Sequence, residues 1–449
     1  MFGKILVANR GEIAVRVIRA CREMGIRSVA VYSSADAASR HVTLADEAVH
    51  IGPAPAKRSY LDIPAVIGAA ELTGAEAVHP GYGFLSEDPY FAEICAEHGL
   101  TFIGPPPDVM GQVGDKATAR RLMTEAGLAL LPGTVRPVAS LDEATGVAAT
   151  IGYPLVIKAV AGGGGRGITV VERPGDLRAA YLGTRAQAQA VFGDSAVYME
   201  RYLSSVRHIE VQVLCDAYGG AVHLGERDCS IQRRHQKLVE EAPSPGVDAT
   251  LRAELGLAAL RGAKAIGYRG AGTMEFLLDD DGRFWFMEMN ARIQVEHPVT
   301  EMVTGIDLIA AQIRVAAGER LGFDQADVSL RGHAIECRVN AEDPARSFAP
   351  APGRLESFLP PGGPFTRVDS HCTPGYQVPP HYDSMIAKLI VWGEDREVAI
   401  DRALRALDEF EVSGPGVHTT IPFCRRVLNH PHFRAGDVAT NFLSTHLGL

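Results

Sequence analysis

Short apolar runs alternate with longer amphipathic stretches over the first part of the chain. The runs fall at residues 4–8, 28–32, 47–51, 76–79 and 101–104. This alternation is typical of a parallel sheet with helices on both faces, so we predict a doubly wound, Rossmann-like unit over residues 1–112. The first strand-to-helix turn, Asn9-Arg10-Gly11-Glu12-Ile13, lacks the Gly-x-Gly-x-x-Gly fingerprint. The sheet alone therefore does not indicate a dinucleotide site.

Two later strand patterns, at residues 273–278 and 284–288, flank an Asp-Asp-Asp-Gly sequence that favours a hairpin. If Asp281-Gly282 forms a two-residue turn, Asp280 pairs with Arg283 and Glu275 lies opposite Glu288. Facing carboxylates are destabilising unless a cation lies between them. With the Asn290 oxygen they suit magnesium better than zinc, which predicts a metal site. A solvated strand face with acids there by chance is the alternative.

Polar side chains continue past this hairpin at every second position. They are Glu288, Asn290, Arg292, Gln294 and Glu296. An extended chain turns alternate residues to the same face. We therefore predict a single polar strip able to bind metals or anions.

A glycine-rich stretch at residues 162–167 lies inside a second predicted unit, which begins where Asp115 can cap a helix over 117–126. The residues after the glycines are β-branched and predict a strand. A dinucleotide or Walker A site needs a helix there, so both interpretations fail. A glycine hairpin that folds over phosphates, with Lys158 and Arg166 as cations, fits better. A merely flexible loop is the alternative.

Residues 226–237 carry a local excess of cations, flanked by acidic residues. The whole chain has a formal net charge of -10, which disfavours nucleic acid as a partner. A small polyanion fits this run better, and a solvated charged face is the alternative.

Length and composition indicate a soluble globular enzyme of two or three domains, with 449 residues, 22% charged and 46% hydrophobic. Seven scattered cysteines without a Cys-x-x-Cys spacing predict reduced thiols rather than disulfides or a zinc site. The amino terminus runs directly into a strand pattern, and no apolar run approaches the ~18 residues of a membrane helix. We expect a cytoplasmic protein without membrane contact.

Taken together and in order, these segments resemble the ATP-grasp superfamily and, within it, the biotin carboxylase family. The resemblance spans essentially the whole chain. Its matching segments are residues 8–14, His79-Pro80-Gly81-Tyr82-Gly83-Phe84-Leu85-Ser86-Glu87, 162–167, 226–237, 288–298 and 382–389. The expected architecture is a Rossmann-like domain (1–112), an ATP-grasp domain (113–330) with a mobile lid at about 131–204, and an α+β domain (331–449). A new strand pattern at 331–337, after a helical pattern at 308–317, agrees with the last boundary.

The resemblance implies a ligase that works in two steps. ATP phosphorylates bicarbonate to carboxyphosphate, and the carboxyl carbon then passes to N1′ of biotin tethered to a carrier protein. The implied nucleotide contacts are Lys116, Lys158, Gly163, Gly164, Gly165, Glu200, Leu203, His208, Gln232, His235 and Leu277. Magnesium, or manganese, on Glu275, Glu288 and Asn290 would bridge phosphate oxygens.

The same resemblance assigns the remaining chemistry to the polar strip and to a later arginine. The residues implied to hold bicarbonate are Lys237, Arg292, Gln294 and Val295. Glu296, kept ionised beside Arg292, would be the general base. Arg338 would stabilise the oxyanion of deprotonated biotin, while Tyr82 and Gly83 would meet biotin. The structural alternatives are a carboxylate that only pairs with Arg292 and an ordinary strand arginine.

The implied partners are a carboxyltransferase subunit, a biotin carboxyl carrier protein and a second copy of the chain in a homodimer. No Ala-Met-Lys-Met biotinylation signal occurs, so biotin is expected on a separate carrier. The expected setting is the first half-reaction of an acyl-CoA carboxylase such as acetyl-CoA carboxylase, in fatty acid biosynthesis. The sequence leaves the final carboxyl acceptor open among acetyl-CoA, propionyl-CoA, pyruvate and others.

Two other functions stay open at this point. One is a different ATP-grasp ligase that uses an acyl phosphate, and the other is a non-catalytic ATP-binding regulator. Arg201, Val160-Ala161 and Ile168 depart from the residues usual in the family. None of them is a residue expected to make or break bonds.

Overall fold

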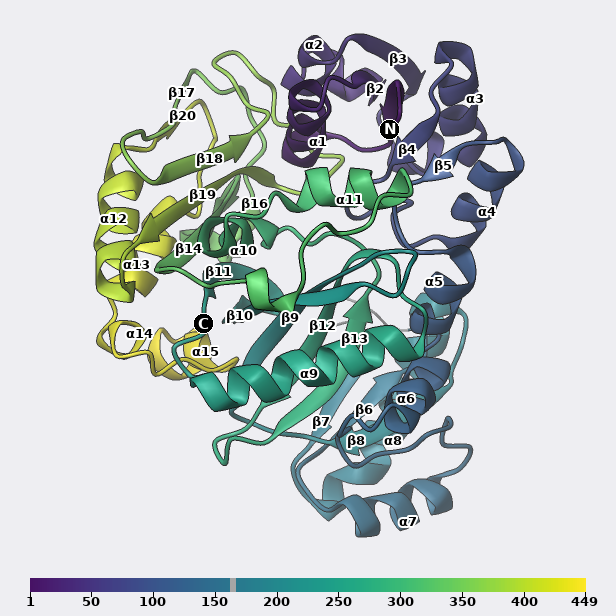
Figure 1. Cartoon of the computed structure of the whole chain (residues 1–449). Helices are drawn as coiled ribbons and strands as arrows, with labels where there is room; N and C mark the ends of the chain where they lie inside the picture. Colours follow the sequence, from purple (N-terminus) through teal and green to yellow (C-terminus); the bar gives the residue numbers. More distant parts are fainter. Residues whose placement is uncertain (162–166) are drawn as a thin grey trace.

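The amino-terminal unit is an α/β layer built on a five-stranded parallel sheet with the strand order β3-β2-β1-β4-β5 (Figure 1). The computed structural model describes residues 1–161 and 167–449. The unit consists of β1 (Lys4–Val7), α1 (Gly11–Glu23), β2 (Arg27–Ser33), η1 (Ser34–Asp36), α2 (Arg40–Leu44), β3 (Glu47–Gly52), η2 (Ala56–Arg58), α3 (Ile63–Thr73), β4 (Ala77–His79), α4 (Pro89–Glu97) and β5 (Thr101–Phe102). Ile5, Leu6 and Val7 are fully buried because helices cover both faces of the sheet. The predicted doubly wound sheet is confirmed.

The strand order reverses between β1 and β4, and this point holds the loops that reach the site. In doubly wound sheets, ligands bind outside the carboxyl ends of the strands at such a reversal. Asn9, directly after β1, donates from Nδ2 to the Pro80 carbonyl at 2.7 Å and to the Tyr82 carbonyl at 2.8 Å. The loop after β4 that carries Tyr82 and Gly83 is therefore fixed to the neighbouring strand end.

An eight-stranded antiparallel sheet forms the main body, in the order β13-β12-β9-β10-β11-β14-β19-β18. Helix α9 runs along β9 and β10, and α12 packs on β14 and β19 (Figure 1). Its central elements are α5 (Pro107–Gly114), α6 (Lys116–Glu125), β9 (Arg207–Cys215), β10 (Ala221–Arg233), β11 (Gln236–Ala242), α9 (Ala249–Ala265), β12 (Gly270–Leu278), β13 (Phe284–Asn290), α10 (His297–Thr304) and α11 (Leu308–Ala316). Asp115 caps α6 as expected, because its side chain accepts a hydrogen bond from the Thr118 backbone N–H.

Strands from both sides of residue 330 join this one sheet. Pairing of β11 with β14 places Glu240 opposite Glu336 and Val239 opposite Cys337. The carboxy-terminal elements are η4 (Gln325–Asp327), β14 (His333–Asn340), β15 (Glu342–Asp343), η5 (Pro344–Arg346), β16 (Ala349–Pro350), β17 (Ser357–Leu359), β18 (Thr366–Ser370), β19 (Met385–Gly393), α12 (Arg396–Glu409), β20 (Glu411–Ser413), α13 (Ile421–Leu428), α14 (Pro431–Arg434) and α15 (Phe442–His446). A site on β11 can therefore take side chains from β14 directly.

A small separate layer lies beside the main sheet, at the bottom of Figure 1. It consists of α7 (Leu141–Ile151), β6 (Leu155–Ala159), β7 (Ile168–Val171), η3 (Pro174–Asp176), α8 (Leu177–Phe192) and β8 (Val197–Arg201). The strands pair antiparallel in the order β7-β6-β8 and bury their own apolar cluster, which includes Ile157, Tyr181 and Met199. The strand predicted after the glycine stretch is confirmed as β7, and it pairs antiparallel with β6. Gly163, Gly164, Gly165 and Arg166 lie outside the described residues.

The hairpin of β12 and β13 keeps the predicted pairing of Glu275 with Glu288, but by a different route. The predicted two-residue turn is wrong: Asp279 pairs with Arg283 through a hydrogen bond of 2.9 Å, which leaves a three-residue turn ending at Gly282, where φ is 77°. The register then shifts between Glu275 and Phe276, with Met287 as the extra residue. The bulge restores the counted register because it compensates for the longer turn.

All seven cysteines are buried and unbridged. Within the part of the chain that the structure describes, no helix is both long enough and apolar enough to span a membrane.

Candidate active site

A row of four charged residues crosses four adjacent strands of the main sheet. Cα pairing joins Arg227 on β10 to Glu210 on β9, Glu210 to Glu275 on β12, and Glu275 to Glu288 on β13. Three neighbouring carboxylates repel one another strongly unless cations lie among them. The row therefore defines a place where positive charge must gather.

Lys237 supplies most of that charge from β11. Its Nζ contacts Glu210, lies 3.2 Å from Glu275 Oε1 and lies 2.7 Å from Glu296 Oε1. Burial alone would lower the pKa of Lys237, but the charges of these carboxylates outweigh burial and raise that pKa well above its usual value. Lys237 is thus a permanent cation in the centre of the site.

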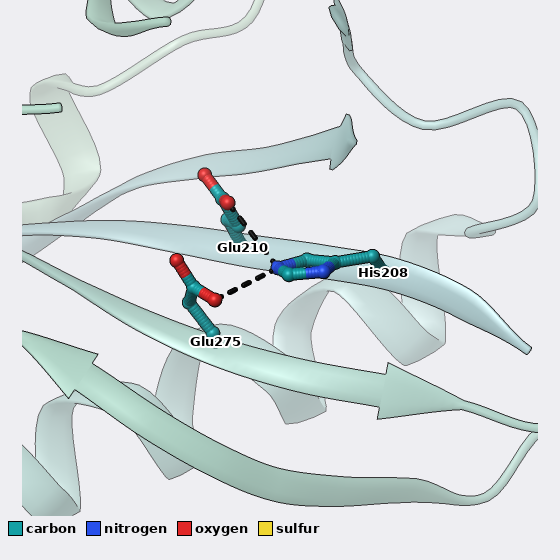
Figure 2. Close-up of side chains that lie close together, drawn as sticks. All are labelled: His208, Glu210 and Glu275. Atoms are coloured by element: carbon teal, nitrogen blue, oxygen red, sulfur yellow. Dashed lines mark ion pairs between the residues drawn. The ribbon is translucent and has the colours of Figure 1, made fainter. Parts of the chain in front are cut away.

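His208 is the second cation of the row. Its Nε2 lies 2.9 Å from Glu275 Oε2 and 3.3 Å from Glu210 Oε1 (Figure 2). Burial opposes protonation, but the charge of Glu275 and the close contacts with both carboxylates raise the pKa of His208 to about 9. Against its own burial, Lys237 lowers the pKa of Glu210 to about 2. The cluster in Figure 2 is therefore an ion-pair network at neutral pH.

The predicted metal residues lie together at one end of this row. Asn290 donates from Nδ2 to Glu275 Oε1 at 2.7 Å, and Glu288 is opposite Glu275 with its side chain exposed to the site. Two carboxylates and an amide oxygen form the hard oxygen donor set that magnesium prefers. The residues present therefore fit a magnesium ion, since Glu288 offers an exposed carboxylate beside a buried one.

Glu296 is buried between two cations from different strands. Lys237 Nζ lies 2.7 Å from its Oε1, and Arg338 Nη2 lies 2.9 Å from its Oε2. Burial favours the neutral acid, but Lys237 first and Arg338 after it lower the pKa of Glu296 below its usual value. The side chain is thus an ionised carboxylate in a water-poor place.

The ion-pair partners of Glu296 are Lys237 and Arg338 rather than Arg292, although the charges of Arg292 and Glu296 still attract each other. The Arg292 guanidinium pairs instead with Glu87 at 2.9 Å and donates to Asn290 Oδ1 at 2.9 Å. Strand β13 ends at Asn290, so the chain is no longer extended at Arg292 and alternation stops there. The Glu87 partner comes from the amino-terminal unit, more than 200 residues away in the chain, and alternation along one strand could not show it.

Gln294 and Val295 serve the site through fixed hydrogen bonds. Gln294 donates from Nε2 to Glu275 at 2.7 Å and accepts from Arg227 Nη2 at 2.6 Å. The Val295 carbonyl accepts from the buried Lys388 Nζ at 2.7 Å. The segment after β13 therefore stays aimed at the site although it is not a strand.

The basic run at residues 226–237 does not form one polyanion surface. Arg227 is fully buried and binds Glu210, Gln212, Thr273, Gln294 and Thr300. Lys237 faces the interior carboxylates, and only the hairpin tip at 234–236 is exposed. A polyanion at the hairpin tip and Lys237 stays a prediction, while Arg227 organises the site from within.

The expected nucleotide residues lie where the small layer meets the main sheet. Lys158 on β6 pairs with Glu200 on β8 at 2.5 Å, and Arg120 Nη1 also contacts Glu200 at 2.7 Å. Burial lowers the pKa of Lys116 at the start of α6, an effect that Glu288 opposes and Lys158 increases. These groups therefore share one electrostatic environment with the metal residues.

The remaining expected nucleotide residues flank this place. Gln232 Nε2 lies 2.9 Å from His208 Nδ1, and Leu277 is the β12 partner of His208. His235 is at the tip of the β10–β11 hairpin with φ of 65°. Leu203 follows β8.

Tyr82 and Gly83 lie on the loop after β4. The Tyr82 hydroxyl donates to the buried carboxylate of Glu12. Glu12 in turn lies 3.1 Å from Lys388 Nζ, and Lys388 donates to the Val295 carbonyl, so this loop is tied to the segment that precedes Glu296.

Several residues of the site were not predicted from the sequence, among them Glu210, Glu87, Glu12, Glu240, Glu336 and Lys388. Glu210 carried a usable signal, since His208, Glu210 and Gln212 alternate along β9 in the same way as the polar strip. Glu87 and Lys388 lie in the matching segments 79–87 and 382–389, but a single charged residue does not reveal its distant partner.

Family models match three consecutive parts of the chain. The model "Biotin carboxylase, N-terminal domain" matches residues 1–110, "Carbamoyl-phosphate synthase L chain, ATP binding domain" matches residues 115–323, and "Biotin carboxylase C-terminal domain" matches residues 336–445.

Similar proteins match over almost the full length. Biotin carboxylase of Nostoc sp. is 56% identical over 98% of both chains, and a pyruvate carboxylase subunit of Methanothermobacter thermautotrophicus is 53% identical over 99% of this chain and 90% of its own. The biotin carboxylase complex from Campylobacter jejuni superposes with a TM-score of 0.96 at 48% identity, over 99% of both chains. The biotin carboxylase domain dimer of Hydrogenobacter thermophilus 2-oxoglutarate carboxylase, solved with MgADP and bicarbonate, gives 0.95 at 48% identity, over 100% of this chain and 98% of its own.

Proposed function

The chain belongs to the biotin carboxylase family, and on that premise we propose that it uses ATP and bicarbonate to carboxylate biotin on a separate carrier protein. The observation that carries the proposal is the position of Glu296, an ionised carboxylate between Arg338 and Lys237, the lysine that also contacts Glu210 and Glu275 of the carboxylate row. A base, an anion-binding cation and oxygen donors for a metal are the groups that carboxyphosphate formation requires.

Glu275, Glu288 and Asn290 would hold magnesium, or manganese in its place, which would neutralise charge on the phosphate oxygens of ATP. Lys158, Lys116 and His208 add positive charge around the same phosphates. Glu200, Leu203, Leu277 and the residues Gln232 and His235 border the nucleotide, and Gly163, Gly164 and Gly165 are proposed to cover its phosphates. Positioning and charge neutralisation supply most of the catalysis in phosphoryl transfer.

Lys237 and Arg292 bind bicarbonate together with Gln294 and Val295. Glu296 accepts the bicarbonate proton, and the oxygen so exposed attacks the γ-phosphorus of ATP. The bond to the ADP oxygen breaks, which gives ADP and carboxyphosphate. Because its pKa is lowered, Glu296 is ionised before bicarbonate arrives.

Biotin enters beside Tyr82 and Gly83, and Arg338 stabilises negative charge on the ureido oxygen when N1′ loses its proton. Carboxyphosphate first splits at the bond between its carboxyl carbon and the phosphate oxygen, which gives CO2 and phosphate. The released phosphate takes the N1′ proton, and N1′ then bonds to the carbon of CO2 to give carboxybiotin. The guanidinium geometry of Arg338 suits a planar anion.

The proposed partners are a biotin carboxyl carrier protein, a separate carboxyltransferase and a second copy of this chain in a homodimer. Acetyl-CoA carboxylase is the proposed setting. Relatives of comparable identity bear the names of pyruvate and 2-oxoglutarate carboxylases, so we assign the choice of acceptor to the transferase rather than to this chain.

The test measures ADP release by the purified chain with Mg-ATP and bicarbonate, with and without free biotin, while carboxybiotin is tracked. Biotin-stimulated ADP release with matching carboxybiotin supports the proposal. Bicarbonate-dependent ADP release without carboxybiotin would indicate a ligase with another acceptor. Tight Mg-ATP binding without turnover would indicate a regulator.

A further inference from the structure

Two buried glutamates lie directly behind Arg338. Glu240 on β11 and Glu336 on β14 are opposed partners of an antiparallel strand pair, and both side chains are fully buried. Opposed residues of such a pair project on the same face of the sheet with their Cβ atoms ~5 Å apart. Two ionised carboxylates at that distance, without water, are strongly unfavourable.

The hydrogen bonds of this pair are unequal. Glu240 Oε1 accepts from Arg338 Nε at 2.5 Å. Among the residues that the structure describes, Glu240 Oε2 and both oxygens of Glu336 have no hydrogen-bond partner. A buried carboxylate without a donor is costly, whereas one proton between the two groups would let one carboxyl donate to the other.

We propose that Glu240 and Glu336 share one proton as a carboxyl pair that positions Arg338 for the biotin oxyanion. The inference rests on the proposed function, because the action of Arg338 on biotin is part of it. Both glutamates are positioning residues, since each acts through Arg338 and neither faces substrate.

The charge around Arg338 explains why the proton matters. Arg338 already pairs with Glu240 and Glu296. An ionised Glu336 would place a third negative charge behind the same guanidinium and draw it away from the substrate. With the proton in place, Nε stays anchored on Glu240 while the side chain, 16% exposed, still reaches the site.

The surroundings of the pair favour retention of one proton. Burial raises the pKa of Glu240 to about 7, with the charge of Glu296 adding to it and Arg338 opposing it. Burial also raises the pKa of Glu336 well above its usual value, and the charge of Glu240 adds to this. The charged groups that act on the Glu240–Glu336 pair are Arg338, Lys237, Lys388 and Glu296. Lys388 itself also faces the carboxylates of Glu12 and Asp369.

Lys388 does not replace the proton. It is fully buried, and its Nζ donates to the Val295 carbonyl and pairs with Glu12. Its charge is therefore shared with a carboxylate on α1. If both glutamates of the pair were ionised, they and Glu296 would place three negative charges around the single positive charge of Arg338.

The test compares Glu336→Gln, Glu336→Ala and the matched control Glu342→Gln in the full chain. Gln carries a neutral group of the same shape, so it should keep carboxybiotin formation near neutral pH, whereas Ala leaves a cavity and should lower it about tenfold. The alkaline fall in the rate should move upward by about one pH unit or more in Glu336→Gln, because no proton can be lost there. The carboxylate of Glu342 accepts a hydrogen bond from Ser384 Oγ. Glu342→Gln should therefore leave the dependence of the carboxybiotin rate on pH unchanged.

A readout independent of turnover separates this inference from the proposed function. Infrared difference spectra on raising the pH from neutral should show a larger loss of protonated carboxylic acid signal in the parent and in Glu342→Gln than in Glu336→Gln. A loss of the same size in Glu336→Gln and in the parent, or an alkaline fall in rate at the same pH in both, would overturn the shared proton. If the parent forms no carboxybiotin, the proposed function fails while the infrared signal still decides whether the pair is protonated.

Discussion

Replacing Glu296 with glutamine tests whether this carboxylate takes the proton from bicarbonate. Glutamine keeps the shape of the side chain and can still accept one hydrogen bond, from Lys237 or from Arg338. It cannot accept a proton at neutral pH. We therefore expect the variant to fold and to bind Mg-ATP as the parent does, but to form carboxybiotin slowly.

The size of the loss follows from the surroundings of Glu296. A positioned general base contributes about 100- to 10,000-fold, with the efficiency falling as the base becomes weaker. Lys237 at 2.7 Å and Arg338 at 2.9 Å lower the pKa of Glu296 and make it a weak base. We therefore expect a loss in kcat at the lower end, about 100-fold, which corresponds to ~2.7 kcal/mol in the barrier.

The assay is the rate of carboxybiotin formation at saturating Mg-ATP and bicarbonate, with the Mg-ATP Kd measured in parallel. Glu296→Asp is the companion variant, because it keeps the charge but withdraws the carboxylate by one methylene. If the position of the base matters, both variants are slow; if only charge beside Lys237 matters, Asp keeps the activity. A kcat of Glu296→Gln within fivefold of the parent would refute the assignment.

Three further predictions concern the metal, the interior and acid stability. Glu288→Gln should raise the magnesium concentration for half-maximal ADP release about tenfold or more, since one of two carboxylate ligands is lost; an unchanged magnesium dependence would contradict the site. Arg227→Ala should lower the free energy of unfolding by about 3–5 kcal/mol in urea titrations, because the buried Glu210 loses the cation that pairs with it from β10. A change under about 1 kcal/mol would show that the ion pairs around Glu210 reorganise. Burial lowers the pKa of His79 to about 3, below its value in the unfolded chain. The unfolded state therefore binds the proton first, and the free energy of unfolding should fall as the pH drops from about 6.5 towards 3, by on the order of 5 kcal/mol in full. His79→Gln should flatten this fall, and an unaltered dependence of stability on pH in this variant would count against the prediction.

Local patterns determined a large part of this molecule. Strand alternation predicted the parallel sheet of the amino-terminal unit, and Asp115 predicted the start of α6, because both signals depend on neighbours a few residues apart. The pairing of Glu275 with Glu288 was also counted correctly, although the turn was wrong. The bulge at Met287 compensated for the extra turn residue, since a hydrophobic face must stay in register with the core.

Residue types alone left the partners of each charge undecided. Arg292 was expected beside Glu296 because alternation along an extended chain would turn both to one face, yet the strand ends at Asn290 and the Arg292 guanidinium pairs with Glu87. Arg227 and Lys237 looked alike within a basic run, but one is sealed inside the sheet and the other faces the site. Periodicity shows which face a side chain occupies only while the strand continues.

The sequence by itself therefore determined the elements, the hairpin and the set of polar residues that form the site, and through its resemblance it indicated the family. Only the tertiary structure decided that Glu210 completes the carboxylate row, that Lys388 joins α1 to the segment before Glu296, and that Glu240 opposes Glu336 behind Arg338. These contacts join residues up to several hundred positions apart. Their energies depend on burial and on distances between strands, which no local pattern along the chain encodes.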